Sequence, residues 1–200
     1  MFKLRANKSL SLHGEIKVPG DKSISHRSII LGSLAVGETL VNGLLESEDV
    51  LHTVQAMEKF GAIIEKIEEQ KWSIHGRGVG GLDEPETPLY LGNSGTGVRL
   101  LMGVAASHPF NTFFCGDKSL SKRPMRRVST PLKMMGADFI SRAEGSLPLV
   151  CIGPRHILPT QYELPVASAQ VKSAILIAAL GAAGETTIIE PEPTRDHTEL

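Results

Sequence analysis

Three stretches of the chain are apolar over a length that suits a helix. They cover residues 25–35, 96–107 and 170–183 and contain few polar positions. A helix that is apolar nearly all round is one that the rest of the protein covers on most sides. We therefore expect these three helices to lie in the interior.

Two further stretches, 48–62 and 126–137, are apolar on one side only and contain a glycine where a helix would end. Short alternating stretches at 71–76 and 186–190 predict strands. The apolar stripes of the two helices are Val50, Val54, Met57 and Phe60 in the first, and Val128, Leu132 and Met135 in the second.

These elements recur with a period of about 74 residues. The steps from Asp49 to Lys122 and from Lys122 to Asp196 are 73 and 74 residues, and Gly61 and Gly136 lie 75 residues apart. Because helices and strands alternate in each unit, we expect an α/β protein whose repeated units share the apolar helices. The third unit stops where its second helix is expected. We therefore expect about two and a half units and a need for a complementary piece.

Composition and charge narrow the class of partner. The chain has 200 residues, of which 41% are hydrophobic and 22% charged, and its formal net charge is −1. Near-neutrality gives no electrostatic reason to expect nucleic acid or a membrane surface. We find no signal-peptide pattern and no stretch apolar enough to span a membrane. Cys115 and Cys151 lack metal-ligand spacing, so we expect buried free thiols and a cytoplasmic protein.

Small polar residues precede each of the three apolar helices. A helix start exposes unpaired N–H groups and carries about half a positive charge, so three starts that converge would bind an anion. The simpler alternative is that Ser23, Asn93 or Ser94, and Ser168 are only helix caps.

Cations gather beside these starts. Lys22 and Arg27 flank the first. Pro124 suits the first turn of a helix, which would place Arg123 near a helix start, where a cation is unfavourable unless an anion binds. Between residues 116 and 127 the cations are Lys118, Lys122, Arg123, Arg126 and Arg127, against the single acid Asp117. For Lys118 and Arg126 we favour a solvated surface role.

Other candidate chemistry is weaker. We expect His26 to lie on a helix surface, and the role of His197 stays open. The sequence has no GxxxxGK[ST] loop, no GxGxxG after a strand, no HExxH and no CxxC. It therefore gives no support to ATP, dinucleotide or zinc chemistry.

Four separated motifs occur in order along the chain: PGDKSISHRS, LGNSGTGVRLL, GDKSLSKRPM and ASAQVKSAILIAAL. Together they closely resemble the 5-enolpyruvylshikimate-3-phosphate synthase family, class II branch, from about residue 14 to residue 200. That family has two similar domains, each of three βαβαββ units, in an inside-out α/β barrel. The resemblance implies that residues 1–18 are a strand of the second domain. Residues 19–200 would form the first domain, incomplete at its C-terminus.

The resemblance also implies a reaction, the transfer of the enolpyruvyl group of phosphoenolpyruvate to the 5-hydroxyl of shikimate 3-phosphate. Phosphate is released, and neither a metal nor an organic cofactor is needed. The missing half would bring an acidic general base, and the complete enzyme of aromatic amino acid biosynthesis would be a monomer.

Carried over position by position, the resemblance assigns Lys22 to both substrates and to proton transfer. The other residues for shikimate 3-phosphate would be Ser23, Arg27, Ser168, Ala169, Gln170 and Arg195. Those for phosphoenolpyruvate would be Gly95, Arg123 and Gln170.

Two positions depart from parts of the family. Ala169 stands where class I members have Ser, which leaves only a backbone donor there. Gly95 stands where some class II members have Ala, which implies a roomy site that is sensitive to the inhibitor glyphosate.

Two alternatives stay open. An enolpyruvyl transferase acting on UDP-N-acetylglucosamine typically has Asn after the lysine and Cys five residues before the Arg-Pro pair. This chain has Ser23 and Lys118 at those places. The other alternative is an anion-binding half without catalytic activity of its own.

Overall fold

The computed structural model describes residues 4–8 and 11–200. Its α-helices are α1 (Lys22–Leu34), α2 (Glu48–Lys59), α3 (Gly95–Ala106), α4 (Arg126–Met134) and α5 (Ala169–Ala179), with 3₁₀ turns η1 (Leu120–Lys122) and η2 (Ala143–Gly145). Its strands are β1 (Val36–Asn42), β2 (Ile63–Glu68), β3 (Lys71–Arg77), β4 (Leu89–Tyr90), β5 (Asn111–Cys115), β6 (Asp138–Ser141), β7 (Leu149–Ile152), β8 (Gln161–Glu163) and β9 (Thr187–Ile189). The five helices and two strands predicted from the sequence are all present.

The elements form repeated units, as the sequence predicted. The second unit, β4-α3-β5-α4-β6-β7, has a sheet ordered β4-β5-β7-β6 in which β4 and β5 are parallel and the other neighbours antiparallel. The first unit contributes α1-β1-α2-β2-β3 with the matching antiparallel sheet β1-β3-β2. The third contributes β8-α5-β9, in which β8 and β9 are parallel.

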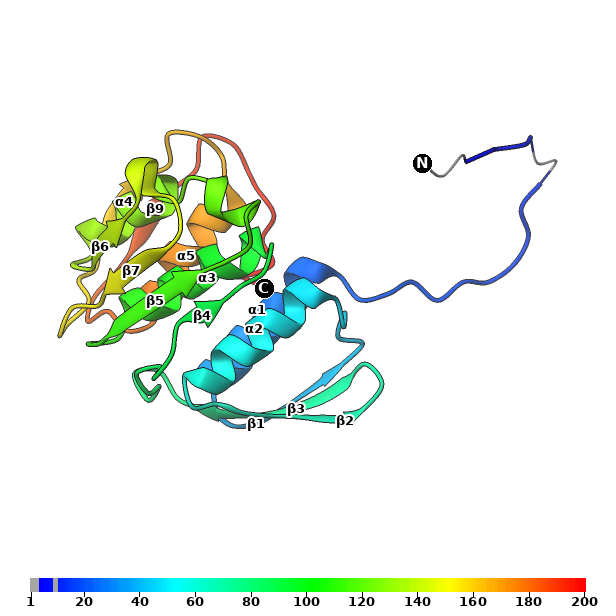
Figure 1. Cartoon of the computed structure of the whole chain (residues 1–200), viewed down its shortest axis with the longest axis horizontal. Coiled ribbons are helices and arrows are strands. Elements are labelled where there is room, and N and C mark those ends of the chain that lie inside the picture. The colour runs from blue at the N-terminus through cyan, green and yellow to red at the C-terminus, as the bar shows by residue number, and fades with distance from the viewer. Residues whose placement is uncertain (1–3, 9–10) are drawn as a thin grey trace.

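The apolar helices pack against one another between the units. Helix α1 contacts α2 and α3, and α3 contacts α5. In Figure 1, α1 and α2 lie over one face of the β1-β3-β2 sheet, while α3 and α5 lie among the strands of the other units. A Cβ atom at Gly103 would lie 2.3 Å from the carbonyl oxygen of Ala174, so only glycine permits this approach of α3 to α5. The close approach brings the N-terminal ends of α3 and α5 side by side.

The two amphipathic helices face the core as predicted. Every residue of the predicted stripes is buried, and Phe60 at the end of α2 and Phe114 in β5 are among the largest fully buried side chains. Cys151 is a buried free thiol as expected, whereas Cys115 is only partly buried because it stands at the end of β5.

The prediction for His26 was wrong. The side chain is 0% exposed, and its Nδ1 lies 2.8 Å from Thr53 Oγ1 of α2. The face of α1 that carries His26 is covered by α2, a long-range contact that the pattern of α1 alone does not contain.

The segment before α1 has no regular structure in its described part. Residues 4–8 and 11–21 form neither helix nor strand, and the segment extends away from the rest of the molecule (Figure 1). The strand expected over residues 1–18 includes residues 1–3 and 9–10, which lie outside the described residues. Its pairing with a second domain stays a prediction. Within residues 4–8 and 11–200, no helix combines the length and apolarity needed to cross a membrane.

Candidate active site

The three central helices begin with side-chain caps and with no acidic residue in the first turn. The caps are Asp21, Ser94 and Ser168, whose side chains accept hydrogen bonds from the N–H group three residues on, at 2.9, 3.2 and 3.4 Å. The prediction of Ser23 as a cap was wrong because α1 begins before it and the Asp21 carboxylate takes that place. The uncapped N–H groups and the positive helix ends stay available for an anion.

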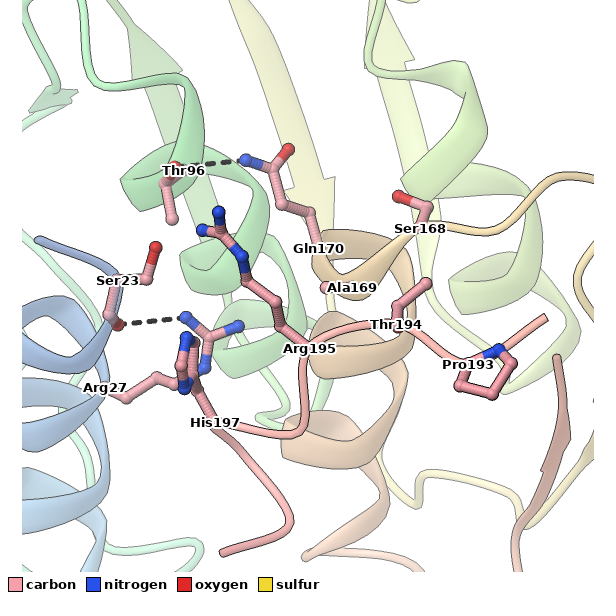
Figure 2. A pocket seen from close by; sticks show the side chains of 10 residues that line it. All are labelled: Ser23, Arg27, Thr96, Ser168, Ala169, Gln170, Pro193, Thr194, Arg195 and His197. Atoms are coloured by element: carbon pink, nitrogen blue, oxygen red, sulfur yellow. Dashed lines mark hydrogen bonds between the residues drawn. The ribbon is translucent and has the colours of Figure 1, made fainter. Parts of the chain in front are cut away.

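Two neighbouring cavities open at these helix starts. The large cavity has a volume of about 490 Å³ and the small cavity about 260 Å³. Thr96 and Gln170 line both of them. Gln170 Nε2 donates a hydrogen bond to Thr96 Oγ1 at 3.0 Å, so this pair stands between the two cavities (Figure 2).

The large cavity contains six of the seven residues that the resemblance assigned to shikimate 3-phosphate. The exception is Lys22, which lines only the small cavity. Among the described residues, no acidic side chain lines the large cavity. Its lining consists of Ser23, Arg27, Thr96, Ser168, Ala169, Gln170, Pro193, Thr194, Arg195 and His197.

Arg27 is held firmly in the wall of the large cavity. The residue is 4% exposed, and burial lowers the pKa of its guanidinium, which nevertheless stays charged. Nη1 donates to the carbonyl oxygen of Ser23 at 2.9 Å, Nη2 to Ser173 Oγ at 2.7 Å and Nε to Thr198 Oγ1 at 2.6 Å. An arginine has five N–H donors, so two remain for a ligand.

The small cavity contains all four residues that the resemblance assigned to phosphoenolpyruvate. Its lining is Lys22, Asp49, Asn93, Gly95, Thr96, Arg99, Arg123 and Gln170. Lys22 Nζ pairs with Asp49 Oδ2 at 2.9 Å, and Arg123 Nη2 donates to Asn93 Oδ1 at 3.0 Å.

Positive charge is in excess in the small cavity. Arg99 Nη1 donates to the carbonyl oxygen of Gly95 and to Gln170 Oε1, both at 3.0 Å. Burial, followed by the positive charges of Arg123 and Arg127, lowers the pKa of Arg99. Within the described part of the chain, no carboxylate forms an ion pair with Arg99 or Arg123. Three cations against one acid leave an excess of two positive charges, which an anionic ligand would neutralise.

The sequence interpretation missed several lining residues. Arg99 follows Gly95 by one helical turn on α3 and so shares its face, a signal that was available. Asp49 is one of the repeat landmarks, but its contact with Lys22 depends on how α1 packs on α2. The others are Thr96 at the start of α3, and Pro193 and Thr194 after β9. Asn93, named at the helix start as a possible cap, lines the small cavity, and His197, left open, lines the large one.

The placement of Arg123 differs from the prediction. Helix α4 begins at Arg126, after Met125, so Pro124 lies outside its first turn. Arg123 stands at the end of η1, and its side chain reaches the start of α3 through Asn93. Arg126 lines neither of the two cavities.

These features define a class of protein: an α/β repeat domain with two adjacent cavities, both lined by cations, at the N-terminal ends of central helices. The family model described as EPSP synthase (3-phosphoshikimate 1-carboxyvinyltransferase) matches residues 6–200, and the chain belongs to this family.

Similar proteins carry the same description. A 3-phosphoshikimate 1-carboxyvinyltransferase of Paramagnetospirillum magneticum is 59% identical over 197 residues, which cover 98% of this chain and 44% of the relative. The protein of that name from Novosphingobium aromaticivorans is 60% identical over 188 residues, covering 94% and 43%. The chain therefore spans less than half the length of the curated relatives it matches.

A solved structure has the same fold. EPSP synthase from Acinetobacter baumannii superimposes with a TM-score of 0.89 at 51% identity, covering 93% of this chain and 42% of that one. The predicted fold class, an inside-out α/β arrangement of repeated units, is thereby confirmed.

Proposed function

We propose that the large cavity binds shikimate 3-phosphate, that the small cavity binds phosphoenolpyruvate, and that the chain takes part in enolpyruvyl transfer between them. The observation that carries the proposal is the pair of adjacent cavities with the shared residues Thr96 and Gln170. Two anions held on either side of this pair would be close enough to react.

The reaction needs positioning, charge stabilisation and proton transfer. The 5-hydroxyl oxygen adds to C2 of phosphoenolpyruvate while a proton adds to C3; the resulting intermediate then loses phosphate from C2 and a proton from C3. Arg123 and Arg99 would stabilise the negative charge of the phosphoenolpyruvate groups. Lys22 would carry a proton, because a lysine can exchange one and the neighbouring arginines cannot.

The proposal includes a second part of the protein, which corresponds to the region of the relatives that this chain does not match. We assign the general base and further cations to that part, and propose that the complete protein is a cytoplasmic monomer. The two free thiols, Cys115 and Cys151, support a reducing compartment.

Phosphate release tests this function. The chain is mixed with both substrates, alone and together with the part of the Paramagnetospirillum relative beyond the matched region. We expect release only in the mixture, and its loss with Lys22→Met. If both anions bind but no mixture releases phosphate, the chain is an anion-binding domain without catalytic activity. Release with UDP-N-acetylglucosamine in place of shikimate 3-phosphate would support the other transferase, which the names of the relatives disfavour.

A further inference from the structure

The segment that follows β9 reaches the large cavity without regular secondary structure. We call residues 193–199 the strap. It carries Thr194, Arg195 and His197, all of which line the large cavity. Figure 2 shows these side chains on the strap, opposite Ser23 and Arg27 of α1. The strap belongs to no helix or strand, and the backbone hydrogen bond from Glu199 N–H to the carbonyl oxygen of Asp196 lies within it. Side-chain contacts are therefore what tie the strap to α1 and α5.

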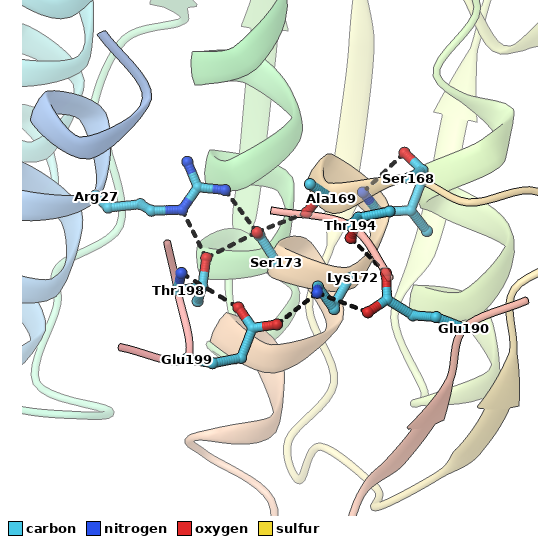
Figure 3. Close-up of polar contacts among 10 residues, drawn as sticks. Arg27, Ser168, Ala169, Lys172, Ser173, Glu190, Thr194, Thr198 and Glu199 are labelled. Carbon is cyan, nitrogen blue, oxygen red and sulfur yellow. Dashed lines mark hydrogen bonds and ion pairs between the residues drawn. The ribbon is translucent and has the colours of Figure 1, made fainter. Parts of the chain in front are cut away.

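Lys172 of α5 pairs with Glu190, three residues before the strap, and with Glu199 at the end of the strap. The residue is 5% exposed, and its Nζ lies 2.7 Å from Glu190 Oε2 and 2.5 Å from Glu199 Oε1. Glu190 also accepts a hydrogen bond from Thr194 Oγ1. Figure 3 shows Lys172 between the two glutamates, with Glu199 on one side and Glu190 with Thr194 on the other. Lys172 itself lines neither cavity.

A second set of bonds ties the end of the strap to α1 and α5. Thr198 Oγ1 accepts from Arg27 Nε at 2.6 Å and donates to Ser173 Oγ at 2.7 Å. Ser173 Oγ in turn donates to the carbonyl oxygen of Ala169 at 2.6 Å. Thr198 and Glu199 are consecutive, so a displacement of Glu199 would also disturb the bond to Arg27 (Figure 3).

The charges favour an ordered cluster. Burial lowers the pKa of Lys172, but the hydrogen bonds to Glu190 and Glu199 outweigh it and leave the pKa above its ordinary value. A cation that is buried between two carboxylates is strongly held, because removing it would leave two partly buried negative charges facing each other.

We propose that Lys172 is a positioning residue, which holds the strap through Glu190 and Glu199 so that Arg195 and His197 face the anion in the large cavity. This inference rests on the proposed function of that cavity. It gives Lys172 a role in binding although Lys172 does not touch the ligand.

A double-mutant cycle tests the coupling. In the 200-residue chain, Arg195→Gln should lower the affinity for shikimate 3-phosphate roughly tenfold, as expected for the loss of a charge-assisted hydrogen bond. In a Lys172→Met background the same change should cost less than about threefold, because Arg195 is no longer held in place. Lys172→Arg, which keeps the charge, should restore most of the coupling. Additive effects of Lys172→Met and Arg195→Gln would overturn the inference.

The matched control is Lys133→Met, which removes the ion pair of Lys133 with Asp138 on α4 and β6, at 2.7 Å. Its effect should be additive with that of Arg195→Gln. Glu199→Gln, a milder change, should give an intermediate result if Lys172→Met folds poorly.

Hydrogen exchange gives a readout that does not need a ligand. The amides of residues 194–199 should exchange at least about tenfold faster in Lys172→Met than in the wild type or in Lys133→Met. Unchanged exchange in this segment would overturn the positioning role alone. Absence of shikimate 3-phosphate binding by the wild-type chain would overturn the proposed function and, with it, the role given to Arg195.

Discussion

The large and the small cavity share one wall, but Arg27 of the large cavity is held differently from Lys22 and Arg123 of the small one. The contrast is between these side chains, because Arg99 of the small cavity also has two internal hydrogen bonds and Arg195 of the large cavity is exposed. In the large cavity, Arg27 is 4% exposed and makes three hydrogen bonds within the protein. In the small cavity, the Lys22 side chain is 48% exposed and pairs with one carboxylate, and Arg123 is exposed with a single side-chain bond to Asn93.

The difference indicates two different tasks. A cation fixed by several internal bonds loses little freedom when a ligand binds, which suits recognition of one anion. Exposed cations can change partner, which suits a site where charge moves during a reaction. Helix α1 contributes to both cavities, through Lys22 on one side and Ser23 and Arg27 on the other.

The largest effect should be on stability and should come from the buried side of α1, the helix that contributes to both cavities. Burial is the main cause that lowers the pKa of His26 from 6.5 to about 4. Because this pKa is lower in the folded chain, the unfolded chain binds the proton more tightly between these values. The free energy of unfolding should therefore fall by roughly 3 kcal/mol as the pH drops from 6.5 to 4.

Urea unfolding across this pH range measures the effect. His26→Gln should reduce the fall, whereas the same change at the exposed His156 should not. Equal pH dependence in the wild type and in His26→Gln would show that His26 is not the titrating group.

The next largest effect should separate the cavities. Arg123→Gln removes one of the two cations in the small cavity that have no carboxylate partner in the described structure. Phosphoenolpyruvate affinity should fall about 100-fold, and the affinity for shikimate 3-phosphate less than about threefold. Calorimetric titration measures both, with Arg155→Gln as the matched control because Arg155 is exposed and lines neither cavity. Equal losses for both ligands would mean that the cavities are not separate sites.

A smaller effect should come from the floor of the small cavity. At Gly95 an added Cβ would lie 2.7 Å from Arg123 Nη1 and 3.2 Å from Arg99 Nη1. Both contacts are with the ends of long side chains, so Gly95→Ala should leave stability nearly unchanged. It should displace the guanidinium groups and lower phosphoenolpyruvate affinity roughly tenfold, as for one lost hydrogen bond. An unchanged affinity would show that the ligand does not approach this helix start.

The smallest effect on stability should come from the ion pair in the small cavity. The side chains of Lys22 and Asp49 are 48% and 26% exposed, so solvent screens their attraction. Asp49→Asn should change the free energy of unfolding by less than about 1 kcal/mol in chemical denaturation. A loss of several kcal/mol would mean that the pair, like Arg27, is part of the rigid framework.

Much of the fold follows from local patterns in the sequence. The apolar length of α3 and the apolar stripes of α2 and α4 were sufficient to place these helices correctly. In each of them, the side chains that the fold buries are the ones that make the pattern in the sequence. The repeat landmarks Asp49, Lys122 and Asp196 revealed the order of the units. The burial of His26 was missed, since it depends on how α2 packs on α1. The cap of α1 was missed although it is local: Asp21 accepts from the N–H of Ile24, three residues on.

The candidate site, like the fold, was predicted only in part from the sequence. The nine assigned residues came from the family resemblance, but their separation into two cavities depends on the contact of Gln170 with Thr96 across 74 residues. Lys172 gave no signal within its apolar helix, because its partners Glu190 and Glu199 are brought to it by the folding of the strap.

The central claim is that two different anions occupy the two cavities at once. Titration of phosphoenolpyruvate into the chain that is saturated with shikimate 3-phosphate tests it most directly. The account predicts that phosphoenolpyruvate binds with a stoichiometry of one and does not displace shikimate 3-phosphate. Mutual displacement of the two ligands would contradict it.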